Sequence, residues 1–362
     1  MTSARPGVLP AQAISAMIKR GEILSDSPIP GDQVQPASLD LRLGATAYRV
    51  RASFLSGRAS TLRERLSEFE MHRIDLTAGA VLEKNCVYLV ELQESLALPE
   101  GVNAVANAKS STGRLDILTR LITDHGVEFD RIDAGYRGPL YAEICPRSFS
   151  VLLRAGMRLN QIRFRRGQAV LDDDALAALH AREVLVSGTA HIDHGLGFSV
   201  DLRPGSGSLV GYRAKPHAGV IDLDRINHYP VADFWEELRS DNGRIILDPD
   251  AFYILVSREA VHIPPDYAAE MAPYLAMVGE FRVHYAGFFD PGFGHGPAGG
   301  HGARGVLEVR CHEAPFVLEH GQIVGRLVYE EMAERPERLY GADLGSNYQG
   351  QGLKLSKHFR AP

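Results

Sequence analysis

The 362-residue sequence predicts a mainly β protein built from two tandem barrel or jelly-roll domains with a few short helices. Brief alternating segments such as LDLRL, VYLVELQ, LYAEI, SVLLRA and QIRF recur between Gly, Pro, Asn and Asp residues, which is typical of many short antiparallel strands. The second observation is an internal duplication of long period. A long period indicates a repeated domain, whereas a short one indicates a solenoid.

The duplication can be followed by residue number. Four residues recur 165 positions later: Tyr88, Glu94, Pro99 and Glu143 as Tyr253, Glu259, Pro264 and Glu308. The segment SLDLR at Ser38 recurs as SVDLR at Ser199, 161 positions later, and Asp133 recurs as Asp290, 157 positions later. We therefore expect one domain over residues 1–180 and a second over 181–362, divided within the polar stretch 165–194.

Helical patterns interrupt the strands in four places. Residues 10–19 space their apolar side chains at helical intervals before Gly21, and further helical stretches lie near residues 58–70, 172–182 and 231–239. The glycine-rich segment 291–305 lies between two predicted strands and is expected to be a polar loop. His295 and His301 within it lack neighbouring Cys or carboxylate residues, so we expect no metal site there.

Composition and net charge limit the kinds of partner and compartment that we expect for this protein. A formal net charge of −6 and a pI near 6.2 argue against general binding to nucleic acid, so a nucleotide would need a local cluster of cations. Three widely spaced cysteines, Cys86, Cys145 and Cys311, favour a reducing compartment over a disulfide framework. The sequence contains no apolar run of signal-peptide or membrane-spanning length, so we expect a cytoplasmic protein without a membrane partner.

The segment AKSSTGR, residues 108–114, has the residue types that bind a polyphosphate. Lys109, Ser110, Ser111 and Arg114 provide two cations and two hydroxyls after the strand-like NAVA. The spacing is not that of the GxxxxGK[ST] phosphate loop, and Lys-Ser-Ser is also common in solvated turns. The segment alone leaves both interpretations open.

A second candidate segment is RIDAGYRGPLYAEI, residues 131–144. A hairpin here would bring Asp133, Glu143 and Arg131 around one small pocket. A carboxylate beside an arginine is either a structural ion pair or a general acid/base whose pKa is set by burial and by the cation. The segment alone favours the structural pair.

Taken together, PASLDLRLG, KSSTGR, RIDAGYRG followed by a strand glutamate, and NYQGQGLKLSK resemble the deoxycytidine triphosphate (dCTP) deaminases, which share the fold of the trimeric deoxyuridine triphosphatases (dUTPases). The similarity runs from about Val8 through the first half and again through the second half to Phe359. It implies two dUTPase-like domains in tandem.

The resemblance assigns roles to individual residues. Lys109, Ser110, Ser111 and Arg114 would bind the triphosphate, together with its Mg²⁺. Asp133 would bind the deoxyribose hydroxyl, and Arg131 and Glu143 would flank the cytosine. The tail residues Tyr348 and Gln351 match the closing segment of the family.

The implied chemistry is a zinc-independent hydrolysis. Glu143 would take a proton from water that attacks C4 and pass protons to N3 and the leaving amine, giving dUTP and ammonia, while Ser110 helps to hold the water. The partners are then dCTP and dUTP, with dTTP as a candidate inhibitor. Relatives build sites between neighbouring barrels of a three-fold ring, so we expect a homotrimer.

Three departures from the family pattern affect the assignment of these roles to residues of this sequence. The segment TDHGVEFD, residues 123–130, makes the first copy longer than single-domain relatives between Ser110 and Asp133. Asn347 stands where relatives can place a lysine. The second copy lacks Ser-Ser and the phosphate-binding arginine and has Phe288 in place of Arg131, so we expect it to support the first copy rather than bind a triphosphate.

Rival functions remain to be compared. A zinc cytidine deaminase needs H-x-E and P-C-x-x-C, which do not occur in the sequence, and no histidine lies near Cys145 in sequence to activate it as a nucleophile. A bifunctional enzyme would continue from dUTP to dUMP by activating a second water; Asp40 is expected to pair with Arg42 rather than to do this. A non-catalytic nucleotide sensor would need neither Glu143 nor Arg131.

Overall fold

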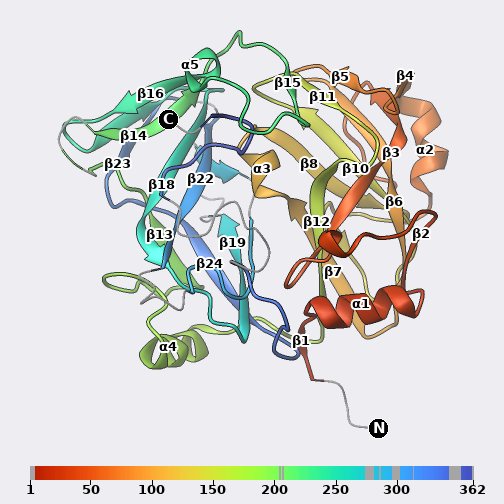
Figure 1. Ribbon diagram of the computed structural model, residues 1–362, viewed down its shortest axis with the longest axis horizontal. Coiled ribbons are helices and arrows are strands. Elements are labelled where there is room, and N and C mark those ends of the chain that lie inside the picture. Colours follow the sequence, from red (N-terminus) through yellow and green to blue (C-terminus); the bar gives the residue numbers. More distant parts are fainter. Residues whose placement is uncertain are drawn as a thin grey trace. The chain divides into compact units, whose positions relative to one another are not determined.

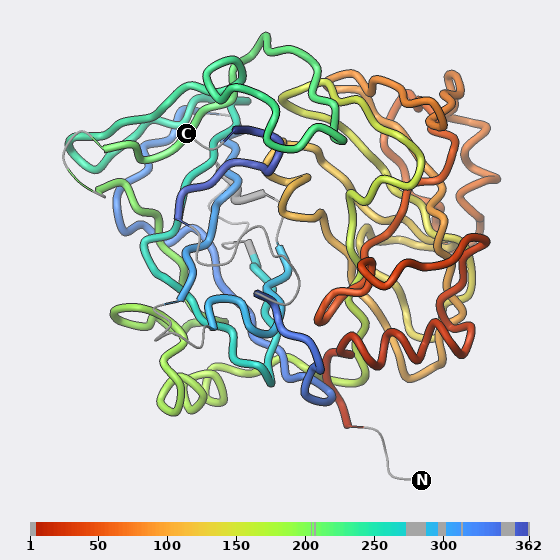
Figure 2. Tube along the Cα trace, viewed as in Figure 1, coloured from red at the N-terminus to blue at the C-terminus, as the bar shows by residue number. Residues whose placement is uncertain are grey.

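A computed structural model describes residues 5–203, 205, 208–273, 281–284, 287–295, 302–312, 314–341 and 352–360, with the backbone alone for 273 and 281–284. The chain forms two compact units (Figures 1 and 2). Unit 1 comprises Met1–Ala169 with Gly219–Ile226, and unit 2 comprises Val170–Ala218 with Asn227–Pro362. We expected the division between residues 180 and 181; it falls between 169 and 170, and the segment Gly219–Ile226 returns to unit 1.

Unit 1 is mainly β, as the alternating segments predicted. Its strands are β1 (Gly7–Val8), β2 (Ile23–Ser25), β3 (Leu39–Val50), β4 (Glu70–Asp75), β5 (Ala80–Leu82), β6 (Val87–Ala97), β7 (Val102–Ala108), β8 (Ile117–Thr123), β9 (Arg131–Ile132), β10 (Arg137–Pro146), β11 (Val151–Leu153), β12 (Arg158–Arg166) and β15 (Ile221–Asp222). Its helices are α1 (Ala11–Lys19), the 3-10 turn η1 (Gly31–Gln33), α2 (Leu62–Phe69) and α3 (Ser110–Gly113).

The main sheet of unit 1 curves into a nearly closed barrel. Its strand order is β8-β10-β6-β3-β12-β7-β9, with β1, β2 and β4 attached to β12, β6 and β3. Asp130 connects the two ends, because its amide donates to the Leu121 carbonyl on β8 while its own carbonyl accepts from the Ala106 amide on β7. The residues just before β9 therefore close the barrel beside β8.

Helix α2 covers the face of the sheet formed by β6, β8 and β10. Thr61 caps the helix in a reciprocal capping box with Glu64, which satisfies two backbone amides at the helix start. Leu62, Leu66 and Phe69 of the helix pack in a cluster that includes Leu89, Ile122 and Tyr141 of the sheet. Figure 1 shows α2 at the edge of unit 1 beside β4.

A segment from the middle of the sequence completes unit 1. Strand β15 pairs in parallel with β11, joining Ile221 to Val151, and Figure 2 shows the chain near residue 221 beside that strand. The guanidinium of Arg154 binds Asp222 at 2.7 Å. These contacts fix the return of the chain to the first barrel.

Unit 2 repeats the mainly β architecture. Its strands are β13 (Leu196–Ser199), β14 (Leu209–Ala214), β16 (Trp235–Arg239), β17 (Arg244–Leu247), β18 (Phe252–Val261), β19 (Tyr267–Pro273), β20 (Phe281–His284), β21 (Phe288–Phe289), β22 (Ala303–Cys311), β23 (Phe316–Glu319) and β24 (Ile323–Glu331). Its helices are α4 (Asp173–Arg182) and α5 (Val231–Phe234).

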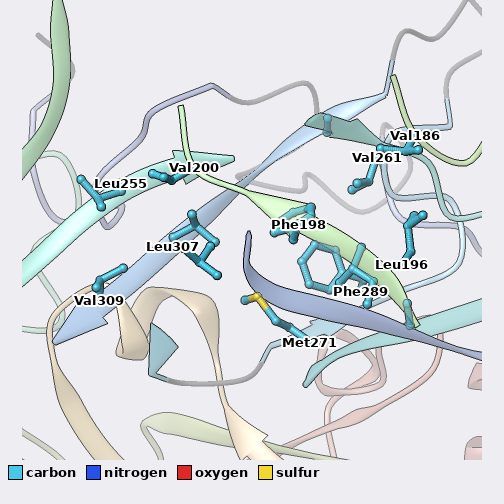
Figure 3. Close-up of a cluster of buried hydrophobic side chains, with 14 of the residues drawn as sticks. Val186, Leu196, Phe198, Val200, Leu255, Val261, Met271, Phe289, Leu307 and Val309 are labelled. Carbon is cyan, nitrogen blue, oxygen red and sulfur yellow. The ribbon is translucent and has the colours of Figure 1, made fainter. Parts of the chain in front are cut away.

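The core of unit 2 lies between sheets of order β13-β24-β19-β21 and β16-β14-β18-β22-β20. Figure 3 shows Phe198 of β13, Leu307 of β22, Met271 of β19 and Phe289 of β21 within this cluster. Because alternate residues of β13, β19 and β22 enter the cluster, burial of apolar surface fixes the register of these strands.

Strand register confirms the duplication. Strand β9 pairs with β7 through Ala104–Ile132, and β21 pairs with β19 through Ala269–Phe289. The first members of these pairs lie 165 residues apart and the second members 157 apart, which are the two offsets read from the sequence. The Tyr88 hydroxyl accepts from the Glu83 amide at 2.9 Å, and Tyr253 accepts from Asp248 at 2.8 Å.

One predicted helix is partly wrong. The helical stretch expected over residues 231–239 ends at Phe234, and Trp235–Arg239 forms β16 against β14. The polar residues of WEELR lie on an edge strand with Trp235 buried, so sheet pairing overrides the local helical preference. Within the described residues, no helix is long and apolar enough to cross a membrane.

Candidate functional site

Glu143 lies in the middle of β10 and is buried. Its strand runs between β6 and β8, and the register places Glu143 opposite Leu89 on β6 and Arg120 on β8. Only 1% of the residue is exposed to solvent. A carboxylate in such a place requires a cation or several hydrogen-bond donors, because burial of an unpaired charge is costly.

Arg120 is the cation that meets this requirement. Oε1 of Glu143 accepts hydrogen bonds from Nε of Arg120 at 3.0 Å and from Nη2 at 2.5 Å. Among the described residues, Oε2 of Glu143 has no hydrogen-bond partner. The two oxygens are therefore inequivalent: one is fixed by two donors, and the other can still accept a proton or a hydrogen bond.

Arg120 was not among the candidates found in the sequence. It is the one charged residue of the strand ILTRLIT, and that was the available signal, because a charge in an apolar strand of a closed barrel must find a partner on an adjacent strand. Its identification required the register between β8 and β10.

Arg131 and Asp133 lie elsewhere. Their side chains are 63% and 88% exposed, and Arg131 forms ion pairs with Glu128 at 3.3 Å and with Asp133 at 3.8 Å. The expected pocket of Asp133, Glu143 and Arg131 is not formed within the described part of the chain. The reason is topological: Arg131 belongs to β9, which pairs with β7 rather than with β10.

The candidate phosphate segment forms a single helical turn after β7. Ser110 and Ser111 begin α3 and are half-buried, Lys109 precedes them, and Arg114 follows with only 3% of its surface exposed. The Arg114 amide donates to the Ser110 carbonyl at 3.0 Å, which closes the turn. The predicted turn at the end of the strand is confirmed. The four candidate phosphate-binding side chains, those of Lys109, Ser110, Ser111 and Arg114, come from six consecutive residues.

Lys109 forms an ion pair with Asp40 of β3. Asp40 is 2% exposed, and its burial raises the pKa of its carboxyl group despite the neighbouring ammonium. The expected pair between Asp40 and Arg42 is wrong. Arg42 instead donates to Glu94 through its amide at 2.8 Å and its Nε at 2.6 Å, and this buried carboxylate draws the guanidinium away from Asp40.

The remaining candidates are the two tail residues, the three cysteines and possible metal ligands. Tyr348 and Gln351 lie outside the described residues. Cys86, Cys145 and Cys311 form no disulfide with one another, and burial raises the pKa of Cys145, which disfavours the thiolate that a nucleophile needs. Among the described residues, no three His, Cys, Asp or Glu side chains are arranged to ligate a metal ion.

A cavity of about 280 Å³ lies under α2, lined by Leu62, Leu66, Leu89, Tyr48, Tyr141 and other residues. Leu89 and Tyr141 are close neighbours of Glu143 in the sheet, since Tyr141 precedes it by two positions on the same face of β10. Glu143 does not line this cavity. We therefore do not take it as the substrate site.

The second unit has a glutamate at the corresponding position. Glu308 on β22 is 5% exposed and lies opposite Ile254 on β18 and His284 on β20. These positions correspond to those of Leu89 and Arg120 around Glu143. Where the first sequence has Lys-Ser-Ser, the second has Tyr274, Leu275 and Ala276, so the second unit lacks the cations and hydroxyls of the phosphate segment.

Comparisons with known proteins address the whole chain. Residues 5–168 match the model of the 2′-deoxycytidine 5′-triphosphate deaminase N-terminal domain, and residues 172–359 match that of the C-terminal domain. A crystal structure of the Agrobacterium tumefaciens 2′-deoxycytidine 5′-triphosphate deaminase is 57% identical, with a TM-score of 0.87, and the match covers 91% of this chain and 99% of that one.

Two curated relatives are more distant. The dCTP deaminase of Natronomonas pharaonis is 31% identical over an alignment of 163 residues, and the match covers 42% of this chain and 74% of the relative. The dUMP-forming dCTP deaminase of Halobacterium salinarum is 30% identical over an alignment of 189 residues, and the match covers 50% of this chain and 89% of the relative. The two names differ in the product.

Proposed function

Because the chain belongs to the 2′-deoxycytidine 5′-triphosphate deaminase family, we propose that it hydrolyses dCTP to dUTP and ammonia with Glu143 as general acid and base. The observation that supports this most directly is the buried Glu143, whose Oε1 is fixed by Arg120 and whose Oε2 has no partner in the described part of the chain. A general acid/base needs one oriented oxygen that can accept a proton and then release it.

The reaction requires three proton movements. Water attacks C4 of the cytosine and gives a proton to Glu143; that proton is transferred to N3, and the proton of the new C4 hydroxyl is transferred to the amino group, which leaves as ammonia. The C4–N bond breaks and the C4 hydroxyl becomes the C4 carbonyl, so dCTP and water give dUTP and ammonia. We assign Ser110 to holding the water and Arg131 to flanking the base.

Binding of the triphosphate is assigned to the first unit. Lys109, Ser111 and Arg114 are proposed to contact the phosphates of the magnesium complex of dCTP, and Asp133 the deoxyribose hydroxyl. The exposure of Arg131 and Asp133, 63% and 88%, supports roles toward a ligand rather than in the core. Tyr348 and Gln351 are proposed to complete the site.

We propose a homotrimer as the active assembly. Within the described residues, no contact joins Arg131 to Glu143, and a site shared between copies would supply each group from a different chain. Light scattering should give a mass of three chains. A monomeric enzyme with full activity would refute this assembly.

Product analysis tests the reaction. Purified protein is incubated with dCTP and Mg²⁺, the nucleotides are separated and ammonia is measured. One equivalent of ammonia per dUTP is expected, without pyrophosphate. Formation of dUMP with pyrophosphate would identify the dUMP-forming reaction for which some relatives are named. Binding of dCTP without ammonia would indicate a sensor.

A further inference from the structure

We propose that Arg120 is a positioning residue for Glu143, and that Oε2 is the oxygen that transfers protons. This inference rests on the proposed deamination and assigns a role that neither the motifs nor the relatives' names provide. Arg120 donates twice to Oε1, at 3.0 and 2.5 Å. Two donors on one oxygen fix the plane of the carboxylate and leave the opposite oxygen directed away from the guanidinium.

Arg120 is itself restrained from two further sides. Its Nη2 donates to Oγ of Ser53 at 3.0 Å, and its guanidinium lies over the Phe129 ring, 3.6 Å from the ring centre. A flexible arginine would lose side-chain entropy on positioning another group. Here Ser53 and Phe129 already hold it in place, so the Glu143 carboxylate is held by a preorganised donor.

Phe129 comes from the extra segment 123–130. Asp130, the next residue, anchors that segment to β8: the Leu121 amide donates to Oδ1 of Asp130 at 2.7 Å, and the Asp130 amide donates to the Leu121 carbonyl at 2.9 Å. Leu121 is the neighbour of Arg120. The additional residues thus place an aromatic ring on the guanidinium that contacts Glu143.

The second unit differs from the first at both parts of this arrangement. His284 stands at the backbone position that corresponds to Arg120, opposite Glu308. Three residues separate β20 from β21, whereas seven separate β8 from β9, so the corresponding connection is four residues shorter in the second copy. The second unit thus has a histidine at the position of the arginine and a shorter connection where the first unit has Phe129.

The test is a comparison of kcat and KM among variants. Arg120→Gln should lower kcat by about 100-fold with KM changed less than about threefold, because misplacing a catalytic group impairs the reaction more than binding. Arg120→Lys should be intermediate, because one ammonium cannot make both bonds. Arg63→Gln is the matched control: Arg63 pairs with Glu91 at 2.6 Å near the same face of the sheet, and its kcat should stay at the wild-type value.

Guanidinium rescue separates positioning from general structural damage. Added guanidinium should raise the kcat of Arg120→Ala and leave Glu143→Gln unchanged. If the Arg120 variants do not fold, Phe129→Leu provides the test, with kcat lowered by about threefold and KM unchanged. Wild-type kcat in Arg120→Gln, or a change in KM alone, would overturn the inference. Absence of ammonia release in the wild type would instead overturn the proposed function.

Discussion

The two units have a buried glutamate at the same place in the same strand framework, but its surroundings differ. Glu143 lies between Leu89 and an arginine, whereas Glu308 lies between Ile254 and a histidine. Backbone pairing and apolar packing have been kept in both copies. The strand framework is therefore common to both units, and the residue that faces the glutamate across the strand pair differs between them.

A second pair of residues makes the same point. Asp40 and Asp201 occupy equivalent places in SLDLR and SVDLR, and Asp40 pairs with Lys109 beside the phosphate segment. Asp201 instead pairs with Arg304 and lies 3.4 Å from His320. Burial opposes ionisation of Asp201, but the hydrogen bond from Arg304 helps to lower its pKa, whereas the pKa of Asp40 is raised by burial. Each carboxylate has a cation, and of the two cations only Lys109 belongs to the segment proposed to bind phosphate.

The strongest test of this comparison is the pair Glu143→Gln and Glu308→Gln. The first should lower the rate of ammonia release by roughly 10²–10⁴-fold, because it removes general acid/base catalysis. The second should retain wild-type turnover. Calorimetry should show that Glu143→Gln still binds dCTP. Equal losses in both variants would mean that the second unit is also catalytic.

Smaller effects are expected when the cations that pair with the two aspartates, Lys109 and Arg304, are substituted. Lys109→Gln should raise the KM for dCTP roughly 10- to 100-fold, because it removes a charged contact to phosphate, and should leave kcat nearly unchanged. Arg304→Gln removes the partner of Asp201 and should lower thermal stability without altering KM. Steady-state kinetics with a thermal unfolding control measures both. A raised KM in Arg304→Gln would place the second unit in substrate binding.

The duplication, the mainly β class and the family could be predicted because each depends on patterns of residues that are close together in the sequence. Alternation marks strands, and the 165- and 157-residue offsets recur as strand pairs in the structure. Lys109 to Arg114 were found together because they are adjacent in sequence.

Arg120 could not be found in this way, because its partner lies 23 residues later and is set by cross-strand register. The same limitation affected Asp40, whose partner Lys109 lies 69 residues away, and residues 235–239, where pairing with β14 replaced the expected helix. Contacts of this kind depend on which strands pair and in which register. A local sequence pattern does not specify that pairing.

The pH dependence of stability should differ in sign between the two aspartates. The folded pKa of Asp201 is lowered, so its ionised form stabilises the fold above the ordinary value of 3.8, and this contribution is lost as pH falls through the folded pKa. Asp201→Asn should therefore cost about 1–2 kcal/mol at pH 7, after allowance for screening, and less in acid. The measurement is chemical unfolding at several pH values.

Asp40 should behave in the opposite way. Its folded pKa is raised, so the wild type gains stability relative to Asp40→Asn as pH falls from neutral through that pKa toward the ordinary value of 3.8. Parallel pH trends for Asp40→Asn and Asp201→Asn would contradict the distinction between a buried carboxylate that favours protonation and one stabilised in its ionised form.

The smallest expected effect concerns the helices before β4 and β16. Helix α2 has the Thr61 capping box, whereas α5 in the second unit begins after Pro230 without a side-chain cap. Thr61→Ala should lower the free energy of unfolding by about 0.5–1 kcal/mol, and Thr61→Ser should restore it, because the serine hydroxyl can accept the same amide. Because α2 packs over Leu89 and Tyr141, the neighbours of Glu143, the same variants also test whether the helix contributes to turnover. A fall in kcat larger than the loss of stability explains would assign α2 a part in ordering the first site, and unchanged kcat would confine its role to the stability of the first unit.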